Sequence, residues 1–268
     1  MFDLEKSLNE FKAQADWVSL RYVNEKTHWR WIRDERPQGF SSNQDQGVMV
    51  EVFVDGQFGY AGTSDISSEG LRRAFLKAKQ MTSAAAAFGV HKFSLEQRPA
   101  HRGHYQSPHL KSFDSLALSE LTDILIGSSK VMKLGEKVVS RLAGTMMVEV
   151  ETQQVSSSGA DLAQNFAIVS TNLSTTSTDG KESQTRTDAG GLARCLQIGA
   201  EVFNREDILQ RSERIARESL ELLSADNCPT DTMDLILAPD QMTLQIHESI
   251  GHPLEYDRIL GDERNYAG

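Results

Sequence analysis

The chain has 268 residues, 39% of them hydrophobic, which is enough for a sizeable core in one large domain or two ordinary ones. Its 38 acidic residues outnumber the 28 basic ones, and the net charge of -10 argues against binding along the phosphates of DNA or RNA. No stretch approaches the roughly 18 apolar residues of a membrane span, so we expect neither nucleic acid nor membrane as a direct partner.

Residues 1–90 predict an α+β unit of helix, four strands and helix. Apolar residues at helical spacing predict the first helix over residues 2–14. Asp55-Gly56 predicts a hairpin turn, and Ser67 is expected to cap a second helix that runs to about residue 88. Alternation with a period of two predicts the strands, at 17–23, 27–33, 47–54 and 58–62.

Residues 91–112 are polar, contain two prolines, and predict a linker. Three of its histidines lie close together in the sequence, at His101, His104 and His109. A metal site is one interpretation of them. Their spacing fits no regular face and no cysteine or carboxylate accompanies them, so we favour surface histidines on a loop.

Residues 113–230 predict a second α+β unit with long strands. Helices are expected at 113–134 and 205–223, and strands at 138–155 and 165–178. The Ser/Thr-rich end of the second strand, residues 170–178, also fits disorder by composition, but the turns that flank it favour an exposed strand. The whole pattern predicts an α+β fold with antiparallel sheets flanked by helices.

Residues 231–268 are expected to hold a short apolar strand, Met233 to Ala238, followed by a helix that carries the most specific motif. That motif is His247-Glu248-Ser249-Ile250-Gly251-His252. Zinc peptidases commonly space two histidines at i and i+4, on one helix face. Here the spacing is i+5, which leaves the two rings about 140° apart on a regular helix.

Two local features of the chain offer ways to bring the rings together. Gly251 could end the helix in the left-handed conformation while Pro253 pushes His252 out of the α region. Alternatively, one π-turn would put residues i and i+5 on the same face, and such turns are frequent at functional sites. The sequence leaves both open.

The residue types indicate zinc hydrolase chemistry. Neutral His247 and His252 are suitable zinc ligands. Glu248 lies next to a ligand and could take a proton from water and pass it to a leaving amine. Glu255 and Asp257 could be a further ligand, could accept hydrogen bonds that orient the histidines, or could be solvated loop charges.

The segment from Ile246 to Asp257 resembles the motif of the TldD/PmbA metallopeptidases, also called modulators of DNA gyrase, in their catalytic TldD type. The likeness extends to residues 47–50 and 55–60 and to the Ser158-Gly159 turn. It implies a zinc-dependent peptidase that acts on small or unfolded polypeptides inside a dimer cavity. The dimer would be a homodimer or a heterodimer with a PmbA/TldE-type subunit.

The resemblance also implies roles for single residues. His247 and His252 would be zinc ligands and Glu248 the catalytic base. The family's third protein ligand is a cysteine from a larger β-rich C-terminal domain, and neither Cys195 nor Cys228 lies where it should be. We therefore expect a truncated chain, the N-terminal portion of a longer family fold, with an incomplete site and little activity alone.

Two cysteines and the lack of a secretory signal predict a cytoplasmic protein. Two rival functions stay open. One is a non-catalytic peptide-binding or assembly module, in which the exposed Ser/Thr-rich strand would add an extended peptide to a sheet edge. The other is a metal hydrolase that acts on something other than a peptide.

Overall fold

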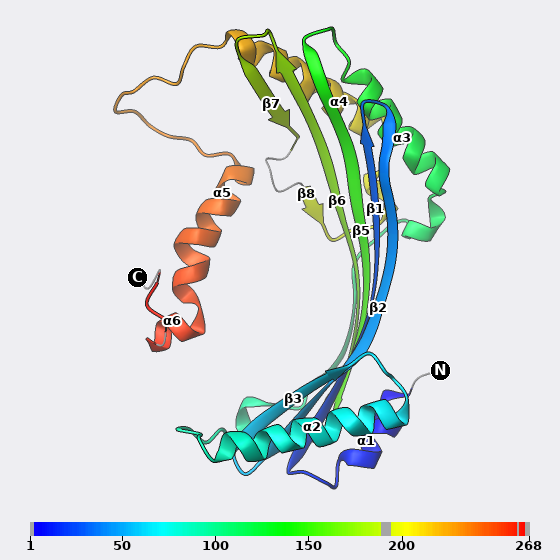
Figure 1. Ribbon diagram of the computed structural model, residues 1–268, viewed down its shortest axis with the longest axis vertical. Helices are drawn as coiled ribbons and strands as arrows, with labels where there is room; N and C mark the ends of the chain where they lie inside the picture. The colour runs from blue at the N-terminus through cyan, green and yellow to red at the C-terminus, as the bar shows by residue number, and fades with distance from the viewer. Residues whose placement is uncertain (1–2, 189–193, 262, 266–268) are drawn as a thin grey trace.

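The computed structural model describes residues 3–188, 194–261 and 263–265, and its centre is one eight-stranded sheet (Figure 1). The strand order is β3-β2-β1-β5-β6-β4, and β7 and β8 also pair with β6. All pairings are antiparallel except that of β4 with β6. The α+β class predicted from the sequence is confirmed.

The strands are β1 (Trp17–Arg33), β2 (Arg36–Val54), β3 (Gln57–Thr63), β4 (Arg102–Gln106), β5 (Val138–Ser156), β6 (Asp161–Thr178), β7 (Ser183–Thr187) and β8 (Arg194–Leu196). The α-helices are α1 (Leu4–Phe11), α2 (Ser68–Ala86), α3 (Leu118–Val131), α4 (Arg205–Glu221), α5 (Pro239–Ile246) and α6 (Tyr256–Leu260). None of the described helices is both long and apolar enough to span a membrane.

Two long hairpins, β1-β2 and β5-β6, run through the whole sheet and join the parts that the sequence divides at residues 91–112. β1 is one continuous strand where two shorter ones were predicted. β2 begins at Arg36, eleven residues before the predicted start. Residues 36–46 are exposed throughout. Because neither of their sides faces a core, their sequence lacks the alternation of apolar and polar residues that predicts a strand. Their pairing with β1 keeps them extended.

Turn and cap residues behave as the sequence predicts. Asp55 and Gly56 take positive φ angles of 52° and 81°, as a primed hairpin turn requires. The Ser67 side chain accepts a hydrogen bond from the Gly70 N–H and caps α2. The predicted linker contains the short strand β4.

Two separate cores cover one face of the sheet. At one end, α1 and α2 pack on β1, β2 and β3, with Phe11 stacked on Phe75 at a centroid distance of 4.8 Å. At the other end, α3 and α4 pack on β1, β5 and β6 around Ile32, Leu173 and Ile215. Apolar residues on alternate strand positions supply the sheet side of both cores.

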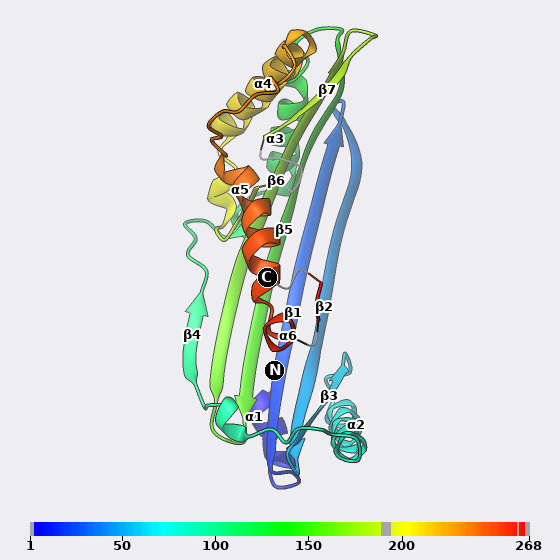
Figure 2. The same cartoon turned by 90° about the vertical axis from the view of Figure 1, so that its left-hand side faces the viewer.

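Residues 225–261 extend away from these cores. Figures 1 and 2 show α5 and α6 on the opposite side of the sheet from α3. The strand predicted at Met233 to Ala238 is wrong, because this segment pairs with no strand in the described part of the chain. Its apolar side chains are exposed, including Leu235 at 79% and Ile236 at 94%. A segment forms a β-strand only where the backbone N–H and C=O groups of a neighbouring strand pair with its own.

Candidate metal centre

The motif lies where α5 loses its regular winding. Residues His247–Gly251 form a π-turn that continues α5, and a 3₁₀ turn at His252–Leu254 follows. The His252 N–H donates to the His247 carbonyl, which is the i to i+5 bond of a π-turn. Gly251 has φ -60° and ψ -59°, and His252 is also in the α region. Of the two possibilities in the sequence, the left-handed helix end is wrong and the π-turn is confirmed.

The π-turn brings the two imidazole rings together. Their centroids are 4.4 Å apart, and the planes meet at 70°. One ligand atom each from His247, Glu248 and His252 lies within 4.8 Å of the others. On a regular helix residues five apart point about 140° away from each other, so this proximity depends on the wider turn.

Glu248 faces both imidazoles. Its Oε1 lies 4.0 Å from Nε2 of His247, and its Oε2 lies 3.9 Å from Nε2 of His252. These distances are too long for hydrogen bonds. The two Nε2 atoms and the carboxylate therefore surround a common space, and neither Nε2 is hydrogen-bonded to the carboxylate. The Glu248 side chain is 43% exposed, so water reaches this space.

A second carboxylate fixes the orientation of one ring. His252 Nδ1 lies 2.8 Å from Glu255 Oε1. Because an ionised carboxylate only accepts, Nδ1 is the donor, and in a neutral ring Nε2 then keeps its lone pair. Arg258 Nη1 lies 3.0 Å from Glu255 Oε2 and holds that carboxylate in place. This arrangement of imidazole and carboxylate is the one that orients metal-binding histidines.

The other candidate residues lie apart from this cluster. The Asp257 side chain accepts from the Arg258 backbone N–H at 2.9 Å, which closes a local turn. Cys195 and Cys228 are both free and exposed, the first in β8 and the second in the extended segment before α5. Within the described ranges, the histidines at positions 101, 104 and 109 belong to no group of metal-ligand side chains.

The candidate metal centre lies in an exposed segment. Between residues 225 and 265, none of the residues whose burial is described is buried. The His247 side chain is 61% exposed and that of His252 is 28% exposed. Local backbone geometry, rather than a surrounding core, thus positions these side chains.

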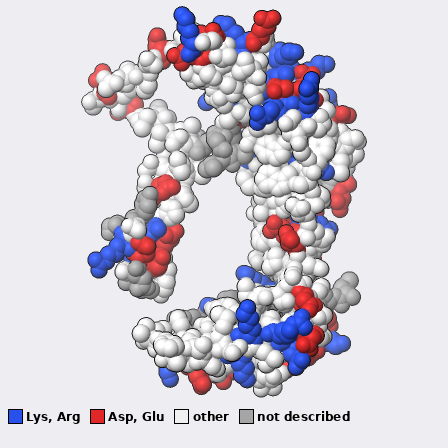
Figure 3. Space-filling model, in the orientation of Figure 1, with Lys and Arg blue, Asp and Glu red and all other residues white. Residues whose placement is uncertain are grey.

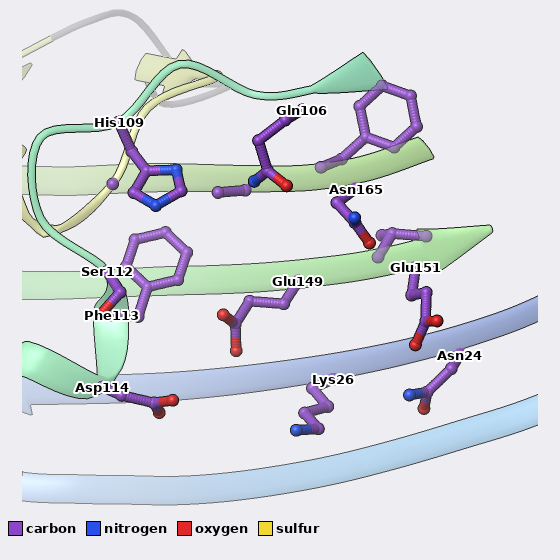
Figure 4. Close-up of a pocket in the computed structure, with 14 residues that line it drawn as sticks. Asn24, Lys26, Gln106, His109, Ser112, Phe113, Asp114, Glu149, Glu151 and Asn165 are labelled. Carbon is purple, nitrogen blue, oxygen red and sulfur yellow. The ribbon is translucent and has the colours of Figure 1, made fainter. Parts of the chain in front are cut away.

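A separate polar cavity of about 280 Å³ lies on the helix-covered face of the sheet, between the two cores. Figure 4 shows Lys26 on β1, Glu149 and Glu151 on β5, and His109 above them on the loop after β4. Lys26 and Glu149 are direct cross-strand neighbours. This cavity shares no lining residue with the motif.

Arg258 is the one residue of the cluster that reasoning from the sequence missed. Its spacing of three from Glu255 is the available signal, since residues three apart on a helical turn are neighbours. The signal is weak because the turn that joins them exists only once the 3₁₀ segment and α6 have formed.

Comparison with known proteins identifies similar sequences. Residues 18–82 match the family described as PmbA/TldA metallopeptidase domain 1. A metalloprotease of Methanothermobacter thermautotrophicus is 23% identical over 257 residues, which cover 94% of this chain and 53% of that protein. A metalloprotease of Methanocaldococcus jannaschii is 21% identical over 263 residues, covering 98% and 56%. The chain thus spans about half the length of these curated relatives.

Solved structures share the fold. A protein described as a modulator of DNA gyrase, from Thermotoga maritima, aligns with a TM-score of 0.64 at 14% identity and covers 85% of this chain and 50% of that one. TldE from Thermococcus kodakarensis aligns with a TM-score of 0.59 at 15% identity, covering 81% and 47%. At these identities the structures establish the architecture alone.

Proposed function

Because this chain belongs to the PmbA/TldD metallopeptidase family, we propose that it is of the TldD type, a zinc-dependent peptidase acting on small or unfolded polypeptides. One observation carries the proposal. The π-turn gathers two imidazoles and a carboxylate, with one ligand atom of each within 4.8 Å of the others.

The donor set fits zinc. His247 and His252 would hold the ion, because imidazole nitrogen is a preferred zinc ligand and both Nε2 atoms face the same space. Bound there, zinc would polarise a peptide carbonyl and make a nearby water more acidic. Tight zinc sites use at least three protein ligands, so two imidazoles alone make a weak site.

Glu248 is proposed as the general base. Its carboxylate is close to both rings, reaches solvent, and is not tied up by a hydrogen bond to either of them. It can take a proton from an attacking water and deliver it to the nitrogen of the leaving amine. Glu255 is proposed to orient His252 through Nδ1. For Asp257 the structure supports neither a ligand nor an orienting role.

The proposal includes an assembly and a location. We propose a dimer, formed either by two copies of this chain or with a PmbA/TldE-type subunit; the fold shared with a TldE structure supports the second. A cytoplasmic location is supported by two thiols that are exposed and unpaired.

The peptide-binding alternative loses its structural basis. It required a free edge on the Ser/Thr-rich strand, which is the end of β6. That edge is occupied, because β8 pairs with residues 169–171 and β7 with residues 174–178, while β5 covers the other side. The stretch is also not simply exposed, since its alternate residues Thr171, Leu173, Thr175 and Ser177 are buried.

Replacement of Glu248 by Gln tests the proposed function. The variant keeps both imidazoles, so it should bind zinc like the wild type. Hydrolysis of an unstructured fluorogenic peptide should fall by about 10²- to 10⁴-fold, because general-base catalysis contributes that much. The assay uses the chain with zinc and with the partner subunit where one is found. Unchanged hydrolysis would show that Glu248 is not the base.

Hydrolysis of esters or non-peptide amides tests the remaining rival. If wild-type protein cleaves such a panel and leaves unstructured peptides intact, it is a metal hydrolase of another kind. Asp257→Asn is the matched control for Glu248→Gln, because it also removes one carboxylate from the same segment but from outside the cluster.

A further inference from the structure

The face of the sheet opposite the two cores has an unusual composition. Alternate strand residues share a face, and residues paired across strands lie on the same face. The register therefore places these residues together: Trp29, Trp31, Met146, Val148, Val150, Phe166 and Ile168. We call this set the apolar face. No helix among the described residues covers it, and its side chains are partly exposed.

The apolar face carries no charge over its central strands. On this side β5 presents only uncharged residues from Ser140 to Gln154, and β6 does so from Leu162 to Thr176. Charged neighbours lie at its borders on β1 and β2: Arg21, Glu25 and Asp45 toward one end, and Arg33 and Arg36 at the other. An antiparallel sheet with one solvated face normally presents polar and charged side chains there, so a face of this kind is built to meet apolar groups.

Two tryptophans form a flat aromatic platform on this face. The Trp29 and Trp31 rings stack with centroids 6.0 Å apart and an interplanar angle of 18°. Trp31 lies against the backbone of Gly144, where a Cβ would come within 2.2 Å of the indole. The glycine thus lets the indole lie flat on β5, and the platform is already formed in the absence of a partner.

The proposed metal centre stands on the same side. Figures 1 and 2 both place α5 and α6 in front of this face, and Figure 3 shows an open hollow between them and the sheet. Few charged side chains lie on the sheet wall of the hollow, whereas acidic and basic ones gather at the α6 end of the opposite wall. A polypeptide held at His247 and His252 would have this face as its neighbouring wall. From Leu142 to Val150 the wall is about 26 Å long, which accommodates about eight extended residues.

Resting on the proposed function, we infer that the apolar face binds the substrate polypeptide, and that it selects extended segments with apolar and no charged side chains. The stacked tryptophans would contact aliphatic, proline or aromatic side chains. Charged side chains would lose hydration on this face and gain no partner. Folded substrates would be excluded, because their apolar side chains are already buried.

Peptide binding to metal-free protein tests this inference separately from hydrolysis. The full chain, with EDTA, is titrated into two dye-labelled ten-residue peptides, one with Leu, Val and Phe at alternate positions and one with Glu in their place. Fluorescence anisotropy should show at least tenfold tighter binding of the apolar peptide. Its binding should also shift the emission of Trp29 and Trp31, which are partly exposed, whereas Trp17 is buried.

A charge on the apolar face is the decisive variant. Val148→Glu should weaken binding of the apolar peptide at least tenfold. Ser42→Glu is the matched control: it adds the same charge to an exposed residue on the other face and should leave binding within twofold. Trp29→Thr should also weaken binding. Because it adds no charge to the sheet, it tests the apolar face even if Val148→Glu does not fold. Thermal melts confirm that each variant folds.

The outcomes separate the inference from its rivals and from the proposed function. Equal binding of both peptides, or unchanged binding by Val148→Glu, would overturn it. A change in oligomeric state in Val148→Glu with unchanged peptide binding would assign the face to a second copy. If Val148→Glu makes residues 225–261 more sensitive to proteolysis and leaves peptide binding unchanged, the apolar face would be assigned to packing against those residues of the same chain. Selective binding together with peptide hydrolysis that Glu248→Gln leaves unchanged would keep the inference and contradict the proposed function.

Discussion

At the residue scale, the position of His252 depends on Glu255. The 2.8 Å contact to Nδ1 turns the ring so that Nε2 faces the Glu248 carboxylate, and Arg258 holds Glu255 from its other oxygen. Carboxylates in this position typically strengthen metal binding by histidine. Glu255 is therefore proposed as a positioning residue, and this role is open to measurement without any activity assay.

Glu255→Ala should weaken zinc binding by about 10- to 100-fold, because His252 loses the partner that fixes its orientation and tautomer. A competition titration against a chromogenic zinc chelator measures the change. Asp257→Ala is the control, since its side chain bonds only to the local backbone among the described contacts. Equal losses in the two variants would contradict the positioning role.

Glu201 illustrates a carboxylate that serves structure. Burial raises the pKa of Glu201, but backbone N–H groups of Leu110, Lys111 and Gly199 outweigh that effect and lower it to about 2. A depressed folded-state pKa stabilises the protein at pH values above the unfolded pKa, near 4.5. That stabilisation is lost as the pH falls through about 2.

Glu201→Gln should therefore lower the free energy of unfolding at pH 7 by about 1 to 3 kcal/mol, the value of hydrogen bonds to a charged group. The difference from wild type should shrink between pH 4.5 and pH 2. Denaturant unfolding at several pH values measures it. Glu136→Gln, on an exposed residue, should change little at any pH. A difference that stays constant down to pH 2 would refute this explanation.

At the element scale, the candidate site depends on one extra residue in a helical turn. The π-turn at His247–Gly251 accommodates the i+5 spacing, and the His252 N–H closes it on the His247 carbonyl. The side chains involved are otherwise exposed, so no core would correct a change in spacing.

Insertion of Ala between Ser249 and Ile250 should abolish zinc binding, because the histidines would no longer have the i to i+5 spacing that the π-turn brings together. Histidines six apart would sit about 120° apart on a regular helix. The same insertion between Thr230 and Asp231, in the extended segment before α5, is the control and should have no effect on zinc affinity. Zinc bound equally by both insertions would mean that the two histidines do not share an ion.

Sequence reasoning succeeded where an element carries its own signal. The hairpin turn at Asp55-Gly56, the Ser67 cap and the helix over residues 205–223 follow from local patterns and are confirmed. It failed where a partner decides the outcome. Residues 36–46 have no alternation yet form a strand beside β1, while Met233 to Ala238 have a strand composition and no partner strand among the residues that the structure describes. Pairing depends on segments far apart in the chain.

The candidate site shows the same limit. His247, Glu248 and His252 are recognisable from residue type and spacing alone. The sequence could not decide between a left-handed helix end and a π-turn, because Gly251 and Pro253 are compatible with both. Nor could it choose between Glu255 and Asp257. Which of these carboxylates reaches His252 depends on the 3₁₀ turn at His252–Leu254, which the sequence did not predict.

At the scale of the whole molecule, one sheet joins the two cores and presents its apolar face toward the motif segment. The sheet is thus both the scaffold for the helices and a wall beside the proposed metal centre. Gly144 matters for that wall because it leaves room for Trp31.

Gly144→Ala should displace the Trp31 indole, because the new methyl group cannot fit 2.2 Å from the ring. We expect a loss of stability of about 1 to 3 kcal/mol, typical of overpacking, and a change in tryptophan emission. Gly103→Ala is the control, since a Cβ there has no atom within 4 Å. If both variants melt alike and fluoresce alike, the platform is not packed as described.

Zinc titration of single-histidine variants tests the central claim most directly. Wild-type protein, titrated directly with zinc, should bind one ion per chain with the modest affinity of a two-imidazole site, and Glu248→Gln should match it. His247→Ala and His252→Ala should each bind at least tenfold more weakly, while His104→Ala, on strand β4 and outside the motif, should bind like wild type. Wild-type affinity in either of the two motif variants would contradict a metal centre formed by the π-turn.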